Sequence, residues 1–127
     1  MSAERSQNTE TALTYFSLLD EFSNSSVFEK IFSLFTDDIE FHTLKGTVLH
    51  GLPELVEFIK EFNRKQEGGK TKHYYRVTKE DADTVVVEWA LAGQNPDGTV
   101  YALQGSDIIT FDDQHKIKKL TVQYSSP

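Results

Sequence analysis

The sequence contains no cysteine among its 127 residues. This absence excludes disulfide bonds, thiolate nucleophiles and cysteine-bound metal centres. Basic residues are also scarce, because 13 lysines and arginines stand against 20 aspartates and glutamates, and they form no block. The chain therefore lacks the positive surface by which proteins bind nucleic acid or anionic membranes, and we expect neither partner.

Long apolar runs are missing too. The opening stretch MSAERSQNTE is polar and has no apolar signal-peptide core, and no later segment approaches the roughly 18 apolar residues of a membrane span. We therefore expect a soluble, cytoplasmic protein. A chain of this length fits one domain that buries about two-thirds of its unfolded surface. We expect a single domain over residues 1–127, with residues 1–8 as a flexible tail.

Two helices are predicted in the first part of the chain. Residues 9–22 place apolar side chains at helical spacing, with Thr9 or Thr11 as the N-cap. The stretch SNSS ends at Ser26, which forms a capping box with Glu29 at the start of a second apolar stripe. That stripe contains Phe28, Ile31, Phe32 and Phe35. The second helix is therefore expected to reach Phe35.

The spacing of apolar residues then changes to that of strands, interrupted by one more helix. Residues 39–43 alternate as a half-buried strand does. A third helix begins near Pro53 and ends before Gly68. Four further strands follow, separated by the turn-forming stretches EDAD, NPDG and DDQH. These strands are residues 71–79, 84–94, 99–111 and 116–124. Together the elements predict an α+β domain whose curved sheet covers the helices on one face.

The stretch LQGSDIITF places a carboxylate, Asp107, inside an otherwise apolar strand. If Asp107 faces inward, Ile109 and Phe111 do so as well, because side chains alternate along a strand. These apolar neighbours predict a raised pKa for Asp107. The carboxylate then either forms a hydrogen bond that anchors the sheet or takes part in chemistry.

The turn NPDG determines what lies opposite Asp107. A tight loop with Gly98 in the left-handed conformation sets Asp107 opposite Val87, so that Val87 and Trp89 face the same side as Asp107. One more loop residue would instead set Glu88 beside Asp107 and create a coupled pair of carboxylates. Turn chemistry favours the first register.

The stretches LFTDDIEFHTLKGTVLHG and VVVEWALAGQNPDGTVYALQGSDIITFDDQHKIKKLTV resemble the nuclear transport factor 2-like (NTF2-like) superfamily, in its SnoaL-like branch. The resemblance covers about Thr11 to Tyr124. It implies a cystatin-like fold in which a cone-shaped, curved antiparallel sheet wraps around three N-terminal helices and encloses a deep pocket. Members of the superfamily include ketosteroid isomerase, polyketide cyclases, epoxide hydrolases, dehydratases and domains that only bind ligands, so the fold alone does not give the function.

The resemblance also assigns candidate site residues. Asp107 matches the inward-pointing carboxylic acid of the enzymes, and Tyr15 matches the tyrosine that donates a hydrogen bond in ketosteroid isomerase. Thr43 stands where that isomerase has its general base, and a threonine hydroxyl cannot abstract a carbon-bound proton unaided. Ketosteroid isomerase chemistry is therefore not expected. The expected ligand-binding residues are Phe16, Leu19, Phe41, Thr43, Phe58, Phe62, Trp89 and Ile109.

Two functions remain open. The first is a ligand-binding domain with an apolar pocket and no chemistry, which the missing second acid-base group favours. The alternative is a cyclase, isomerase or hydratase-type enzyme without a cofactor, in which Asp107 exchanges a proton with an apolar carbonyl-containing substrate and Tyr15 stabilises the oxyanion. No metal site is expected, since the acidic pairs at 37–38 and 112–113 point their side chains apart.

The histidines and the outer sheet face suggest surface roles. His42 should point away from the pocket, His115 lies in a turn, and His73 is expected at either the pocket mouth or an interface. The outer face is unusually apolar for a surface in water. Its residues are Ile108, Val86, Ala90 and part of the set Tyr74, Tyr75 and Val100. We therefore expect a homodimer that pairs through this face.

Overall fold

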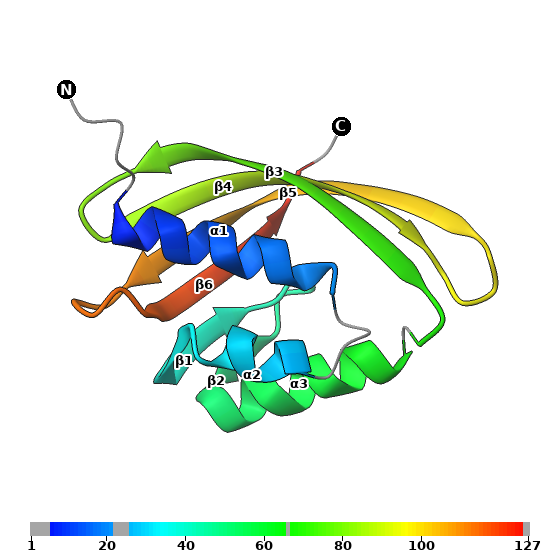
Figure 1. The fold of residues 1–127 in the computed structure, drawn as a ribbon, viewed down its shortest axis with the longest axis horizontal. Helices are drawn as coiled ribbons and strands as arrows, with labels where there is room; N and C mark the ends of the chain where they lie inside the picture. The colour runs from blue at the N-terminus through cyan, green and yellow to red at the C-terminus, as the bar shows by residue number, and fades with distance from the viewer. Residues whose placement is uncertain (1–5, 22–25, 66, 126–127) are drawn as a thin grey trace.

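The computed structural model describes residues 6–21, 26–65 and 67–125. Within them the order of elements is α1 (Gln7–Leu19), α2 (Ser26–Phe32), β1 (Phe35–His42), β2 (Val48–His50), α3 (Leu52–Lys65), β3 (Lys70–Glu80), β4 (Thr84–Gln94), β5 (Val100–Phe111) and β6 (Ile117–Tyr124). The strands form one curved, six-stranded sheet, with α1 against β3 and β4 and α3 against β1 and β2 (Figure 1). The expected α+β fold is confirmed.

The strand order in the sheet is β2-β1-β6-β5-β4-β3. The predicted meander of the last four strands is confirmed, because β3, β4, β5 and β6 pair in sequence and antiparallel. In addition, β1 pairs in parallel with β6, and the short β2 pairs with β1. Strand β2 was not predicted, since three residues are too few to show a period of two.

The turn NPDG adopts the predicted conformation. Its glycine has φ of +93°, and the Asn95 N–H donates to the Thr99 carbonyl over 2.8 Å. Asp107 consequently lies opposite Val87. The register prediction is confirmed, and the alternative that places Glu88 beside Asp107 is excluded.

The start of α1 differs from the prediction. Its N-cap is Ser6, whose Oγ accepts a hydrogen bond from the Thr9 N–H over 3.1 Å. The assignment of Thr9 or Thr11 as the cap is therefore wrong, because the helix begins earlier than the apolar stripe. Of the expected tail, residues 1–5 lie outside the described residues, whereas Gln7 and Asn8 are helical. Phe22, expected in this helix, also lies outside them.

The second helix is shorter than predicted. It ends at Phe32, and Phe35 begins β1 instead. The Leu34 carbonyl already accepts a sheet hydrogen bond from the Ile117 N–H over 2.8 Å. Pairing with a strand more than eighty residues away in the sequence thus overrides a local helical spacing that continues through Phe35. The Phe35 ring packs in the core with its centroid 5.7 Å from that of Tyr15.

The core lies between the concave face of the sheet and the helices. Alternate residues of the central strands point into it, as a period of two requires. The fully buried members on β4, β5 and β6 are Val85, Val87, Ile109, Phe111, Ile117 and Leu120. No helix in the described part of the chain is long and apolar enough to cross a membrane.

Candidate functional site

A cavity of about 780 Å³ opens between α1, α3 and the concave face of the sheet. Helix α1 contributes Tyr15, Phe16 and Leu19, and α3 contributes Phe58 and Phe62. The last two are 37% and 46% exposed. Such exposure of two phenylalanines is explained by their position on an open cavity rather than in the closed core. The sheet side is lined by His73, Trp89, Leu91, Leu103, Asp107 and Val122.

Most residues that the sequence analysis assigned to a pocket line this cavity. They are Tyr15, Phe16, Leu19, Thr43, Phe58, Phe62, Trp89 and Asp107. Phe41 and Ile109 do not line it. Ile109 is fully buried and Phe41 is 5% exposed, and both pack in the core. They follow the correct alternation, but their side chains pack against other core residues and not on the cavity.

Asp107 is 3% exposed and is held in the floor of the cavity by the sheet. Its neighbours on the adjacent strands are Val87 and Val122, so no charged group flanks it in the sheet. Trp89 Nε1 donates a hydrogen bond to Asp107 Oδ1 over 2.9 Å. Burial raises the pKa of Asp107 to about 7, although the hydrogen bond from Trp89 partly opposes this shift. The carboxyl group can therefore gain or lose a proton near neutral pH.

Gly105 allows Trp89 to reach Asp107. Trp89 on β4 lies opposite Gly105 on β5. Gly105 is two positions before Asp107, so both belong to the same face of the sheet. A Cβ atom on Gly105 would lie 2.5 Å from the Trp89 indole and 2.2 Å from the Gln123 carbonyl oxygen. Only glycine leaves room for the indole to lie across β5. Trp89 was predicted to face the pocket, but its role as a hydrogen-bond donor was not, because that role depends on the close approach of its indole to β5 at Gly105.

Tyr15 faces the same end of the cavity from α1. It is 5% exposed, and burial, with a smaller effect from the charge of Asp107, raises its pKa well above the usual value. Tyr15 therefore remains a protonated phenol. Its ring is held by edge contacts, with centroids 5.3 Å from Phe16 and 5.7 Å from Phe35. The structure shows no hydrogen bond between Tyr15 and Asp107, so the phenol can donate to a bound molecule.

Thr43 occupies the position expected for a base but performs a structural role. It is 8% exposed, and its Oγ1 accepts a hydrogen bond from the Thr47 N–H over 3.1 Å. This contact closes the loop between β1 and β2. Its sequence neighbours in the cavity lining, Leu44 and Lys45, supply no carboxylate. Apart from Asp107, the carboxylate that lines the described cavity is Glu61 of α3, which forms an ion pair with Arg64.

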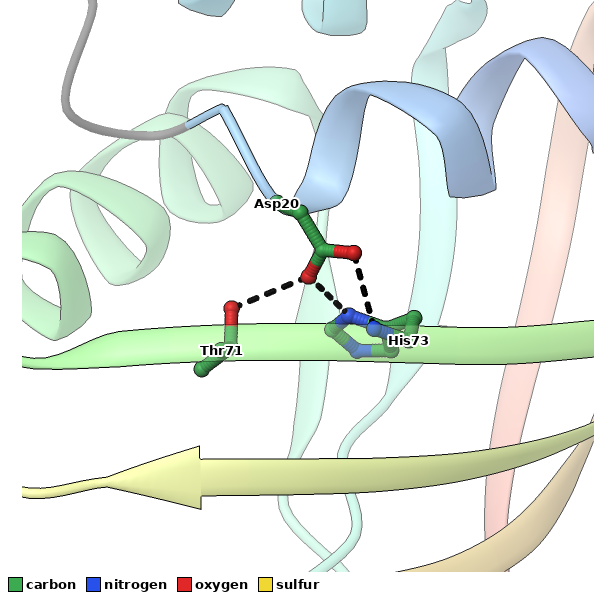
Figure 2. Close-up of polar contacts among 3 residues, drawn as sticks. All are labelled: Asp20, Thr71 and His73. Carbon is green, nitrogen blue, oxygen red and sulfur yellow. Dashed lines mark hydrogen bonds and ion pairs between the residues drawn. The ribbon is translucent and has the colours of Figure 1, made fainter.

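A second polar residue in the cavity wall is His73, which is hydrogen-bonded to Asp20. Figure 2 shows both residues together with Thr71. Asp20 Oδ1 lies 2.6 Å from His73 Nδ1 and accepts from Thr71 Oγ1 over 3.0 Å. Asp20 Oδ2 accepts from the His73 N–H over 2.7 Å. Partial burial opposes ionisation of Asp20, but these hydrogen bonds outweigh it and lower its pKa below the usual value.

From the sequence, His73 was expected at either the pocket mouth or an interface, and Asp20 was not among the candidate residues. The structure places His73 in the cavity wall. Its carboxylate partner lies 53 residues earlier in the chain, so no local motif connects them. The one signal available in the sequence was an acidic residue at the end of a helix, where the helix dipole disfavours negative charge.

The other three histidines and the acidic pairs at 37–38 and 112–113 do not line the cavity. His42 Nε2 is 2.6 Å from Glu40 Oε2, and His115 Nδ1 is 2.8 Å from Asn8 Oδ1. Neither histidine lines the cavity. In the described ranges, no group of three histidine, cysteine, aspartate or glutamate residues is arranged to hold a metal ion.

The model of the SnoaL-like domain family matches residues 17–120 of the chain. The chain belongs to the SnoaL-like family. Among solved structures, it is similar to an NTF2-like protein of unknown function from Exiguobacterium sp. 255-15, with 30% identity and a TM-score of 0.80. That alignment covers 92% of this chain and 99% of the other. Both findings confirm the resemblance seen in the sequence.

More distant solved structures share the fold. A Xanthomonas campestris pv. campestris protein proposed to be a polyketide cyclase is 17% identical, with a TM-score of 0.77 and coverage of 94% of this chain and 90% of that one. The epoxide hydrolase/cyclase-like enzyme SalBIII, of pyran ring formation in the polyether salinomycin, is 18% identical, with a TM-score of 0.74 and coverage of 93% and 90%. Comparison with curated proteins gives no match.

Proposed function

We propose that this protein binds a small, largely apolar molecule that carries a carbonyl or hydroxyl oxygen, with that oxygen placed at Asp107. The observation that carries the proposal is a carboxyl group 3% exposed, with a pKa of about 7, in the floor of an apolar cavity. A buried carboxyl group needs hydrogen-bond partners. Trp89 supplies one at Oδ1, and a ligand oxygen supplies the partner for Oδ2.

The geometry suits an oxygen in particular. When Asp107 is protonated, it donates to a carbonyl oxygen; when it is ionised, it accepts from a hydroxyl group. Tyr15 remains protonated and can donate to the same oxygen. A cavity of about 780 Å³ lies within the range of about 300–1,000 Å³ in which proteins enclose most of a drug-sized ligand.

One observation favours a second function, that of an enzyme. A pKa of about 7 is close to the optimum for a group that both takes and returns a proton at neutral pH. Asp107 would then remove a proton from carbon or oxygen, and Tyr15 would donate to the developing oxyanion. Such a reaction is an isomerisation, cyclisation or elimination without a cofactor. The names of the cyclase-like neighbours support this class.

The binding proposal is tested by fluorescence. Trp89 is the only tryptophan and it lines the cavity, so its emission reports directly on occupancy. We expect saturable changes with polycyclic ketones and phenols, and none with their hydrocarbon parents at the same concentration. Equal binding of hydrocarbons and oxygenated analogues would contradict the proposed role of Asp107.

Variants distinguish binding from catalysis. Asp107→Asn keeps the shape and the acceptor for Trp89 but cannot exchange a proton. Under the binding proposal it changes affinity by only a few fold, whereas under the enzyme alternative it abolishes turnover. Tyr15→Phe provides the second comparison, because it removes one donor without leaving a hole. Undiminished turnover in the Asp107→Asn protein would exclude Asp107 as the group that transfers the proton.

We also propose that the protein forms a homodimer through the outer face of its sheet. Tyr74 and Val100 are 63% and 76% exposed on this face, and Val86 and Ile108 are paired there on neighbouring strands. Light scattering after size-exclusion chromatography should give twice the 14.5 kDa chain mass. Tyr74→Glu should lower the measured mass to that of a single chain. A wild-type protein with the mass of a single chain would contradict the proposed homodimer.

A further inference from the structure

Asp20 occupies an electrostatically unfavourable position. It is the C-cap of α1, and the last turn of this helix contains no basic residue. The negative end of the helix dipole disfavours a carboxylate there. Asp20 nevertheless accepts three hydrogen bonds from β3, two from His73 and one from Thr71 (Figure 2). These contacts offset the unfavourable position and hold the His73 ring in one orientation.

The hydrogen bonds also determine which nitrogen of His73 carries the proton. Asp20 is ionised, since its pKa is lowered by its three donors, and an ionised carboxylate can only accept hydrogen bonds. His73 Nδ1, at 2.6 Å from Asp20 Oδ1, must therefore be the N–H. In the neutral ring, Nε2 is left without a proton and becomes a hydrogen-bond acceptor.

His73 Nε2 is free to meet a ligand. The His73 side chain is 14% exposed and belongs to the cavity wall. Phe16, another wall residue, packs edge-on against the imidazole with centroids 6.4 Å apart. Among the residues that the structure describes, none forms a hydrogen bond with Nε2, although Nδ1 and the backbone N–H are both paired.

We propose that His73 is a second ligand-binding residue, which accepts a hydrogen bond at Nε2 from a hydroxyl group of the ligand, and that Asp20 positions it. The inference rests on the proposed function, because it adds a second polar contact to the same cavity. The ligand then has two oxygens, one at Asp107 and a hydroxyl group at His73. Asp20 itself does not touch the ligand.

The sheet register gives the separation of Asp107 and His73 along the backbone of the sheet. Asp107 lies opposite Val87, and His73 lies opposite Leu91, four residues further along β4. At about 3.3 Å per residue this is roughly 13 Å along the strand, and the two strand spacings from β5 to β3 add roughly 10 Å across. Trp89, Leu91 and Leu103 line the wall between them. The ligand class is therefore an elongated apolar ring system with oxygens at opposite ends.

The first test needs no ligand. Nitrogen-15 NMR of the histidine rings, at a pH where they are neutral, should show His73 protonated at Nδ1 and unprotonated at Nε2. Asp20→Asn should weaken this preference, because a neutral amide no longer requires a donor. A wild-type His73 protonated at Nε2 would overturn the inference, since Nε2 could not then accept a hydroxyl proton.

The second test uses two probes that differ in one group, 2-acetyl-6-hydroxynaphthalene and 2-acetyl-6-methoxynaphthalene. Both place a ketone at one end, but only the first has a hydroxyl donor at the other. Wild-type protein should bind the hydroxyl probe roughly tenfold more tightly, the value of one good hydrogen bond. His73→Phe should remove this preference and leave the affinity for the methoxy probe unchanged within a few fold.

His42→Phe is the matched control, because His42 does not line the cavity, and it should retain the preference. If His73→Phe weakens both probes equally, His73 only fastens α1 to β3 and the inference is overturned. If wild type binds both probes equally, the inference fails but the proposed function stands. If wild type binds neither, the proposed function itself fails, and the inference fails with it.

Discussion

Trp89 donates its indole N–H to Asp107 Oδ1 over 2.9 Å, from β4 to β5 and within the buried floor of the cavity. The bond links the only tryptophan of the chain to a carboxyl group whose pKa is raised to about 7. Because Trp89 satisfies only Oδ1, the arrangement holds the carboxyl group in place and leaves its second oxygen for a ligand.

The stability of the protein should depend on pH through Asp107. In the folded state its pKa is about 7, against an ordinary value of 3.8, so folded protein binds more protons between these pH values. The free energy of unfolding should therefore fall as pH rises through this window, by up to about 1.4 kcal/mol per pH unit. Asp107→Asn should remove this contribution. Urea denaturation at several pH values measures the free energy of unfolding. The same pH dependence in wild type and Asp107→Asn would contradict a raised pKa for Asp107.

Replacing Trp89 should raise the pKa of Asp107 further. Trp89→Phe removes the one hydrogen bond that lowers this pKa and leaves a buried oxygen unpaired, at a cost of about 1–3 kcal/mol. Carbon-13 NMR of the Asp107 carboxyl group follows its titration directly. A midpoint that falls in the variant would show that the indole does not stabilise the ionised form.

Gly105→Ala should destabilise the protein and displace the indole. The added methyl group would meet both the Trp89 ring and the Gln123 carbonyl oxygen, and overpacking of this kind costs about 1–3 kcal/mol. The expected signs are a lower melting temperature and a shifted Trp89 emission. Gly98→Ala is not a suitable comparison because Gly98 has a positive φ; Ala102→Gly serves as a mild control on the outer face of the same strand. Unchanged emission in Gly105→Ala would contradict the packing described.

The N-cap of α1 can be tested by comparing two hydroxyl residues. Ser6→Ala removes the acceptor for the Thr9 N–H and should cost about 1 kcal/mol. Thr11→Ala removes only a side-chain contact to the Gln7 carbonyl within the helix and should change stability by less than about 0.5 kcal/mol. Thermal unfolding of both variants measures the difference. A larger loss of stability for Thr11→Ala than for Ser6→Ala would indicate that Thr11 is the N-cap, as expected from the sequence.

Several features of the fold and site could be predicted from the sequence because they depend on nearby residues. The turn NPDG specifies a register through the left-handed glycine, and the register places Asp107 opposite Val87. Alternation along the strand then turns Asp107 toward the core. The same alternation led to the expectation that Phe41 and Ile109 line the pocket. Alternation shows which face of the sheet a side chain lies on, but not whether it lines the cavity or packs in the core.

The sequence by itself determined the succession of helices and strands, the meander and the inward direction of Asp107, because periodicity and turn chemistry act over a few residues. Only the tertiary structure decided that Phe35 belongs to a strand and that Gly105 admits the indole of Trp89. It also brought Asp20 to His73 across 53 residues. Such contacts depend on packing between distant segments, and no local pattern encodes them.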